Sequence, residues 1–150
     1  MSLYSIALFV HIVGALSLFA LLAIEGVSLR AGLSPRAVQQ SLGPVSAAAI
    51  VIPGFYMAAQ IGWHGWVAVG LVSYAVIAVL GAYTGINLMR GTMSPRTAAI
   101  SWLARVGIAL GVVFDMTVKP DAVASVIAVV VAMAAGAAVA LLVRREVRTA

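Results

Sequence analysis

The sequence contains no cysteine and very little charge, and each absence excludes whole classes of protein. Without cysteine there are no disulfides, thiolate metal sites, iron–sulfur clusters or cysteine nucleophiles. Only 9% of the 150 residues are charged and 64% are hydrophobic, a balance that a water-soluble domain of this size does not tolerate. The blocks of basic residues lie beside long apolar runs, where such residues set the orientation of a protein in the membrane. The composition therefore predicts an integral membrane protein that is surrounded by a lipid bilayer and has no nucleic-acid partner.

Five apolar runs are long enough to cross about 30 Å of hydrocarbon as helices. They cover residues 4–24, 44–61, 67–89, 98–118 and 122–143. No basic residue precedes the first run, so we expect a retained helix there and not a signal peptide. The sequence predicts an all-α fold, in which a bundle of five transmembrane helices forms a single domain over residues 1–150.

The second run is short and carries unusual residues at its start and in its middle. Residues 35–43 are polar enough to form a short interfacial turn of helix, which Gly43 and Pro44 then redirect into the membrane. Pro53 and Gly54 interrupt the run at mid-depth. This interruption predicts either a simple proline kink or exposed backbone carbonyls that hold an ion.

The basic residues are distributed unequally between the two ends of the spans. Seven of the nine follow the first, third and fifth spans, namely Arg30, Arg36, Arg90, Arg96, Arg144, Arg145 and Arg148. Lys119 alone lies at the opposite end. The positive-inside rule therefore places the N-terminus outside and the C-terminus in the cytoplasm, which requires an odd number of spans. We expect a multi-pass protein of a bacterial-type cytoplasmic membrane, with Trp63 and Trp66 as anchors at the outer boundary.

Two similar segments, RAGLSPRAV and RGTMSPRTA, lie sixty positions apart on the predicted cytoplasmic side. In each copy the serine, Ser34 or Ser94, is placed to cap the first free amides of the next helix. The prolines that follow, Pro35 and Pro95, suit the first helical position. The spacing reflects either duplication of a two-helix unit or the same capping solution used twice.

Small residues four apart occur on three of the spans. Lipid offers no hydrophobic drive for helix association, so close approach through small residues must supply the contact energy. We expect the third and fourth spans to pack through their glycines, and the fifth to present a similar face, in a compact bundle or at an oligomer seam. The pairs are Gly81 with Gly85, Gly107 with Gly111, and Ala132 with Gly136.

An ionisable side chain inside a span is a functional candidate, and His11 is the first of these. It shares one helical stripe, which should face the bundle, with Gly14, Ala15, Leu18, Leu22 and Glu25. The imidazole either bonds a neighbouring helix or binds a ligand. At the cytoplasmic end of the stripe, Glu25 is expected to form a boundary ion pair with an arginine.

Three further charged residues belong to the fourth span. Arg105 lies about two turns inside it and either extends back to the headgroups or points inward, where it pairs with Glu25 or holds an anionic ligand. Asp115 and Lys119 are four residues apart at the outer end, a spacing that favours a pair along the helix. The alternative is that these two residues line or gate an outer cavity.

Imidazole and thioether groups gather in the predicted outer half of the membrane. The residues are His11, His64, Met57 and Met116. Thioether and imidazole ligands together suit Cu(I), and two imidazoles suit haem iron, so copper and haem are the two cofactors that this set would hold. Methionine is also an ordinary filler of membrane helices, and the spacing matches no ligand motif.

The segments LFVHIVGAL and DMTVKP resemble the small bacterial membrane proteins of the DUF2269 family, relatives of the CopD-type copper-resistance membrane domain. The resemblance implies family positions at His11, Gly14, Met116, Lys119 and Pro120. The chain departs from the family pattern at Leu18, Ala20 and Leu21, and in having a fifth span. In having a single histidine in the first of several helices, the chain is also similar to a haem-binding protoporphyrinogen oxidase. The DUF2269 family is largely without assigned activity, so the resemblance leaves the function open.

These features favour a non-enzymatic membrane component. The sequence has no glycine-rich phosphate loop, paired intramembrane carboxylates, Ser-His-Asp set or zinc-ligand spacing. Such a protein either binds or passes a small ligand or ion in the outer half, around His11, Asp115 and Lys119, or serves as an accessory subunit of a larger membrane complex. The rival class is a membrane redox protein or enzyme that holds haem or copper through His11.

Overall fold

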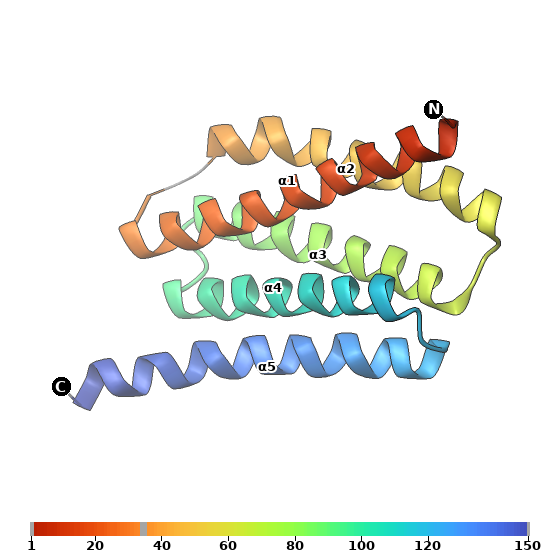
Figure 1. The fold of residues 1–150 in the computed structure, drawn as a ribbon. Coiled ribbons are helices and arrows are strands. Elements are labelled where there is room, and N and C mark those ends of the chain that lie inside the picture. Colours follow the sequence, from red (N-terminus) through yellow and green to blue (C-terminus); the bar gives the residue numbers. More distant parts are fainter. Residues whose placement is uncertain (1, 34–35, 150) are drawn as a thin grey trace. The chain divides into compact units, whose positions relative to one another are not determined.

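The computed structural model describes residues 2–33 and 36–149, including every side chain in these ranges except those of residues 36, 37 and 143–149. The described residues form five α-helices, in agreement with the predicted all-α fold (Figure 1). Each predicted span lies within one helix. The helices are α1 (Leu3–Ala31), α2 (Arg36–Ile61), α3 (Gly65–Met89), α4 (Pro95–Val118) and α5 (Ala122–Thr149).

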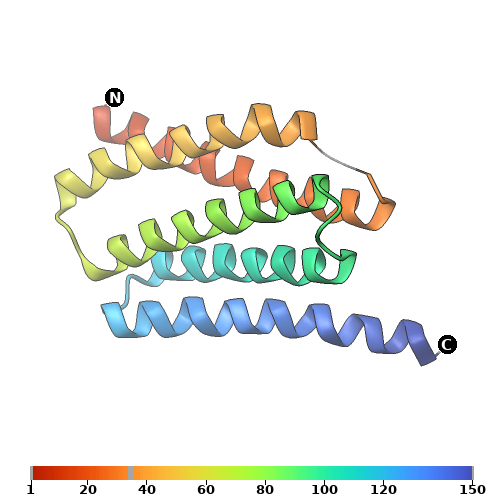
Figure 2. The same cartoon turned by 180° about the vertical axis from the view of Figure 1, so that it is seen from behind.

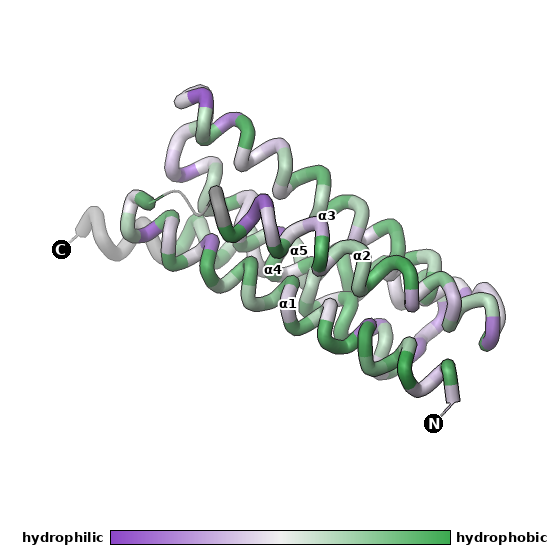
Figure 3. The backbone as a smooth tube through the Cα atoms, turned by 90° about the horizontal axis from the view of Figure 1, so that it is seen from above, coloured by the Kyte–Doolittle hydropathy of each residue, from purple (hydrophilic) through white to green (hydrophobic). Residues whose placement is uncertain are grey.

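All five helices contain a stretch that is long and apolar enough to cross a membrane. Hydrophobic residues dominate the length of each helix, and hydrophilic residues gather near the helix ends (Figure 3). Large apolar side chains such as Phe9 on α1 and Val79 on α3 are each 67% exposed. Surface of this kind is stable in lipid and not in water. The chain is therefore a multi-pass membrane protein.

The helix ends confirm the capping expected from the sequence where the structure describes it. Ser94 Oγ accepts a hydrogen bond from the backbone N–H of Thr97 at 3.1 Å, and Pro95 is the first residue of α4. The equivalent residues of the first copy, Ser34 and Pro35, lie outside the described residues.

Residues 36–43 are helical as predicted, but they are continuous with the second span, so the expected break at Gly43 and Pro44 is wrong. Helix α2 is continuous from Arg36 to Ile61 and contains both Pro44 and Pro53. A proline inside a helix removes one backbone hydrogen bond, and membrane helices tolerate this because neighbouring groups take up the freed carbonyl.

The chain divides into two compact units, and each is described by itself. Unit one, Met1–His64, contains α1 and α2, and unit two, Gly65–Ala150, contains α3, α4 and α5. Within unit one the two helices run antiparallel, and within unit two α4 lies beside both α3 and α5 (Figures 1 and 2).

In unit one the helices approach most closely at Gly14. A β-carbon at this position would lie 2.8 Å from the backbone carbon of Ala49, so only glycine fits. The Ser46 hydroxyl, which is buried, donates to the backbone carbonyl of Gly14 at 3.0 Å. A small residue and a serine thus join the two helices, as is typical of membrane proteins.

In unit two the glycines of α4 pack against α5 and not, as predicted, against the glycines of α3. A β-carbon at Gly107 would overlap the carbonyl oxygen of Ala132, and one at Gly111 would lie 2.8 Å from Val129 Cα. From the other side, a β-carbon at Gly136 would overlap the carbonyl oxygen of Leu103. Helices α4 and α5 are therefore in backbone contact along these glycines.

Helix α3 packs against a different face of α4. A β-carbon at Gly70 would overlap the methyl group of Met116, whereas a β-carbon at Gly85 would meet no atom within 4 Å. Near the other end of the pair, the hydroxyls of Thr84 and Ser101 are hydrogen-bonded at 2.7 Å. At these positions α3 and α4 therefore meet through side chains and not through paired glycines.

Candidate functional site

His11 is held by unit one in a defined orientation. Its Nδ1 lies 2.8 Å from the backbone carbonyl oxygen of Ile50. A carbonyl oxygen can only accept, so Nδ1 must carry a proton and donate it. The prediction of an imidazole bonded to a neighbouring helix is confirmed. In the neutral ring Nε2 then carries the free lone pair.

The contact of His11 falls on the irregular part of α2. A β-carbon at Gly54 would lie 3.4 Å from His11 Cε1, so the ring lies against the glycine that follows Pro53. Pro53 cannot donate to the carbonyl of Ala49, which is the residue before Ile50. Pro53, Gly54 and His11 thus lie together where α1 contacts α2.

Asp115 lies at the centre of the strongest candidate site. Its side chain is 0% exposed, and among the described residues neither carboxylate oxygen has a hydrogen-bond partner. Ser125 on α5 is the hydroxyl with which it interacts, although the two groups do not reach full hydrogen-bond geometry. Unpaired carboxylates are costly in a helix bundle, because desolvation of a charge is not offset by a partner.

The packing of α4 on α5 explains why Asp115 faces Ser125. The two helices are antiparallel, with Gly107 opposite Ala132 and Gly111 opposite Val129. One further turn along α4 reaches Asp115, and one turn back along α5 reaches Ser125. The close contact of α4 and α5 through glycines therefore holds the Asp115 carboxylate and the Ser125 hydroxyl buried between the two helices.

The predicted pair between Asp115 and Lys119 is not formed, and this prediction is wrong. The Lys119 ammonium lies 5.4 Å from the centre of the Trp66 ring, in a cation–π contact. The backbone of Lys119 has left the helix, with φ 52 and ψ 53, because Pro120 follows it. The i to i+4 rule applies only while both residues are helical.

Arg105 is buried inside unit two. Its side chain is 3% exposed, and its Nε donates to the carbonyl oxygen of Ser101 at 3.3 Å. A β-carbon at Gly81 would lie 3.1 Å from Nη1, so this glycine leaves space for the guanidinium. This burial agrees with the inward alternative, whereas a pair with Glu25 and a ligand at Arg105 both stay predictions.

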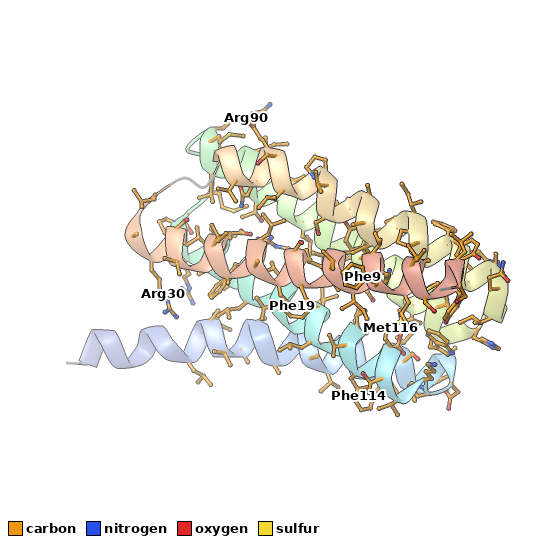
Figure 4. All side chains as sticks on the ribbon, turned by 45° about the horizontal axis from the view of Figure 1, so that its top comes forward. Phe9, Phe19, Arg30, Arg90, Phe114 and Met116 are labelled. Carbon is orange, nitrogen blue, oxygen red and sulfur yellow. The ribbon has the colours of Figure 1, made fainter. Side chains whose placement is uncertain are left out.

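The predicted metal ligands are distributed over both units. His11, Met57 and His64 belong to unit one, where Met57 is buried and His64 Nε2 bonds the carbonyl oxygen of Ile61 at 3.0 Å. Met116 belongs to unit two, near the end of α4 and away from Arg90 (Figure 4). Among the described residues, no three His, Cys, Asp or Glu side chains could hold a metal ion together.

Sequence reasoning missed the buried hydroxyl groups. Ser125 is 0% exposed and is the only polar residue between Ala122 and Leu142, a signal that the sequence did contain. Ser46 and Thr84 are also buried, and each joins two helices through a hydrogen bond. In these apolar spans a single hydroxyl thus marks a helix contact, as the closely packed glycines do.

Comparison of the chain with protein-family models, curated proteins and solved structures finds no match. The resemblance to the DUF2269 and CopD-type proteins therefore stays a prediction.

Proposed function

We propose that this chain is a non-enzymatic membrane protein that binds a small cation at Asp115. The observation that supports the proposal is the carboxylate itself, which is fully buried, with no hydrogen-bond partner for either oxygen among the described residues. Ionisable groups inside membrane proteins mark ion and proton pathways more often than structural positions. A bound cation would supply the positive charge and the bonding partner that the carboxylate lacks among the described residues.

The surroundings of Asp115 favour a small ligand. Backbone contact at Gly107 and Gly111 keeps α4 and α5 close together on the approach to Ser125. The side chains at the site offer three oxygen atoms, two from Asp115 and one from Ser125. A proton needs only one of these, whereas an alkali metal ion would also need backbone carbonyls or water. The proton and the alkali metal ion are alike in that each is a small cation held by oxygen atoms.

The distribution of basic residues supports an outer location for this site. Asp115 lies near the end of α4 that precedes Lys119, whereas Arg90 and Arg96 lie at the other end of α3 and α4. Under the positive-inside rule the Asp115 end faces outward, in a cytoplasmic membrane of bacterial type. The site would then take its cation from the outer side.

Cation binding by purified protein in lipid nanodiscs tests the proposal, with Asp115→Asn as the variant. Wild type is expected to bind one Na⁺ per chain when NaCl replaces choline chloride, or to take up one proton as the pH falls, and the variant is expected to do neither. Asp121→Asn is the matched control. The Asp121 side chain caps α5 through Val123 and Ala124 N–H, and asparagine caps equally well. Binding that survives in Asp115→Asn would contradict the proposal and favour an accessory-subunit role.

A second candidate function is supported by His11. The bond from Nδ1 to the Ile50 carbonyl leaves Nε2 as the available ligand atom, which is the usual arrangement around metal-bound histidines. This candidate is a protein that holds haem or copper through His11. It predicts a Soret band or stoichiometric copper in protein purified gently from its membrane, lost in His11→Ala and retained in His64→Ala. A colourless, metal-free wild type would contradict it.

A further inference from the structure

Three buried oxygen atoms without partners lie together in unit two. They are the two carboxyl oxygens of Asp115 on α4 and the hydroxyl oxygen of Ser125 on α5, and both residues are 0% exposed. No other buried side-chain oxygen or nitrogen lacks a hydrogen-bond partner in the part of the chain that the structure describes. Buried polar groups without partners are rare, and two of them on facing helices indicate a shared ligand.

The contact between Asp115 and Ser125 is poorly suited to a metal ion. An ion held by oxygen needs several ligands at once, and the two side chains supply three oxygen atoms. The backbone carbonyl oxygens of Asp115 and Asp121 already accept helix hydrogen bonds, from the N–H groups of Lys119 and Ser125 at 2.9 Å each. A β-carbon at Gly111 would lie 2.8 Å from the α5 backbone, so the helices are close together one turn away. A metal ion would therefore need more ligands and more room than this contact offers.

A proton needs neither additional ligands nor additional room. It binds one carboxyl oxygen of Asp115 and removes the negative charge, and with it the cost of burying that charge. It can arrive through brief hydrogen-bonded contacts, and carboxyl groups buried in proteins do titrate. The distance to travel is short, because Asp115 lies one helical turn before Lys119, which is exposed at the end of α4.

The Ser125 hydroxyl suits both forms of the Asp115 carboxyl group. A hydroxyl donates a hydrogen bond to a carboxylate and also accepts one from a carboxylic acid. A hydrogen bond to the charged form is about twice as strong as one to the neutral form. Ser125 therefore stabilises the carboxylate more than the acid, and so makes release of the proton easier.

Few other charged or titratable side chains belong to the helices packed around Asp115. On α3, on α4 with its cap, and on α5 with its cap as far as Leu142, they are Tyr74, Tyr83, Arg96, Arg105, Lys119 and Asp121. Lys119 lies on the Trp66 ring, and Asp121 caps α5. Residues 65–150 contain no histidine. The Asp115 carboxyl group is therefore the group at this contact that can take up a proton.

We infer that the cation bound at Asp115 is a proton and that Ser125 is the donor that stabilises the carboxylate when the proton leaves. The inference rests on the proposed cation binding at Asp115 and names its ligand. One proton from water joins one carboxyl oxygen, so the side chain changes from one negative charge to none, and release returns the proton to water. Asp115 binds the proton, and Ser125 is a positioning residue that sets how tightly the proton is held.

The test measures protonation of Asp115 in the complete chain in lipid nanodiscs, with choline, Li⁺, Na⁺ or K⁺ as the only added cation. The infrared band of the carboxylic acid is followed as the pH falls, and its absence from Asp115→Asn identifies it. We expect the band to appear at the same pH in all four salts. We also expect NaCl, added at constant pH, to release no proton from the protein. A metal ion that shared the carboxylate would displace the proton and move the transition to lower pH.

Replacing Ser125 with alanine tests the role of the hydroxyl. Ser125→Ala is expected to raise the proton affinity about fivefold, the difference between a hydrogen bond to a charged and to a neutral acceptor. Ser46→Ala is the matched control, since it removes another buried serine hydroxyl, one that bonds the Gly14 carbonyl in unit one. The control should leave the affinity unchanged. An affinity that falls or stays the same in Ser125→Ala would overturn the role of Ser125.

The outcomes separate this inference from the proposed function. If Li⁺, Na⁺ or K⁺ moves the transition and Asp115→Asn removes the effect, the ligand is a metal ion, so the inference is wrong while the Asp115 site stands. If neither pH nor any of these cations changes the band, both are wrong. Circular dichroism checks that each variant is folded before it is titrated.

Discussion

Replacing Asp115 with asparagine is expected to stabilise the cation-free protein while it abolishes cation binding. The wild-type carboxylate is buried, and no hydrogen-bond partner offsets its desolvation among the described residues. Asparagine has nearly the same shape and no charge, so the free energy of unfolding should rise by about 1–3 kcal/mol. Unfolding in mixed micelles, followed by circular dichroism, measures the change. The gain should be largest at alkaline pH with choline as the only added cation.

Added cation should reverse this order of stability. A ligand that binds only the folded state stabilises it by mass action, so wild type should become more stable with NaCl or at lower pH while Asp115→Asn does not change. The control Asp121→Asn should respond to cations as wild type does. A structural aspartate would behave differently, because its replacement would destabilise the protein at every cation concentration. That result would contradict the role assigned to Asp115.

Replacing Gly107 with alanine is expected to destabilise unit two by about 3 kcal/mol, near the upper end of overpacking effects. The added methyl group would overlap the carbonyl oxygen of Ala132, which belongs to the backbone of α5 and cannot rotate away. Separation of α4 from α5 would also move Ser125 away from Asp115, so cation affinity should fall together with stability. Unfolding in mixed micelles and Na⁺ titration measure the two effects.

The same substitution at Gly85 provides the matched control. A β-carbon there would meet no atom within 4 Å, although the position also belongs to a glycine pair on a membrane helix. Gly85→Ala should be neutral or stabilising by up to ~1 kcal/mol, since alanine is the better helix former. Equal destabilisation by the two substitutions would show that the contact between α4 and α5 has been misplaced.

The long apolar runs predicted the five helices because membrane spans need about 20 consecutive apolar residues, and few other structures do. The cap of α4 was predictable for a similar reason. Ser94 and Pro95 each satisfy a local requirement of a helix start, and no distant residue is involved. Predictions that depended only on the length of an apolar run or on the residues at a helix start are therefore confirmed where the structure describes them.

Predictions about which helices touch were less successful. The glycine pair at Gly107 and Gly111 indicates close approach, but the pattern carries no information about the partner, which is α5 and not α3.

The predicted pair of Asp115 with Lys119 failed for a local reason that the sequence did contain. Pro120 prevents Lys119 from remaining helical, and the i to i+4 spacing then loses its meaning.

The candidate site was only partly visible in the sequence. Asp115 was identified because a carboxylate inside a span is rare, but its unpaired state depends on what packs around it. For His11 the sequence left open a bond to another helix or a ligand. The bond is formed, and its partner is the backbone carbonyl of Ile50, which no residue type in the sequence indicates. Contacts with backbone atoms cannot be predicted from residue types.

An infrared difference spectrum of the Asp115 carboxyl group tests the central claim most directly. Spectra of wild type with and without Na⁺, and at high and low pH, are compared with those of Asp115→Asn in the same lipid. The account predicts a carboxyl signal that changes when the cation or proton binds and that is absent from the variant. A carboxyl spectrum that neither condition changes, or a change of equal size in the variant, would contradict cation binding at Asp115.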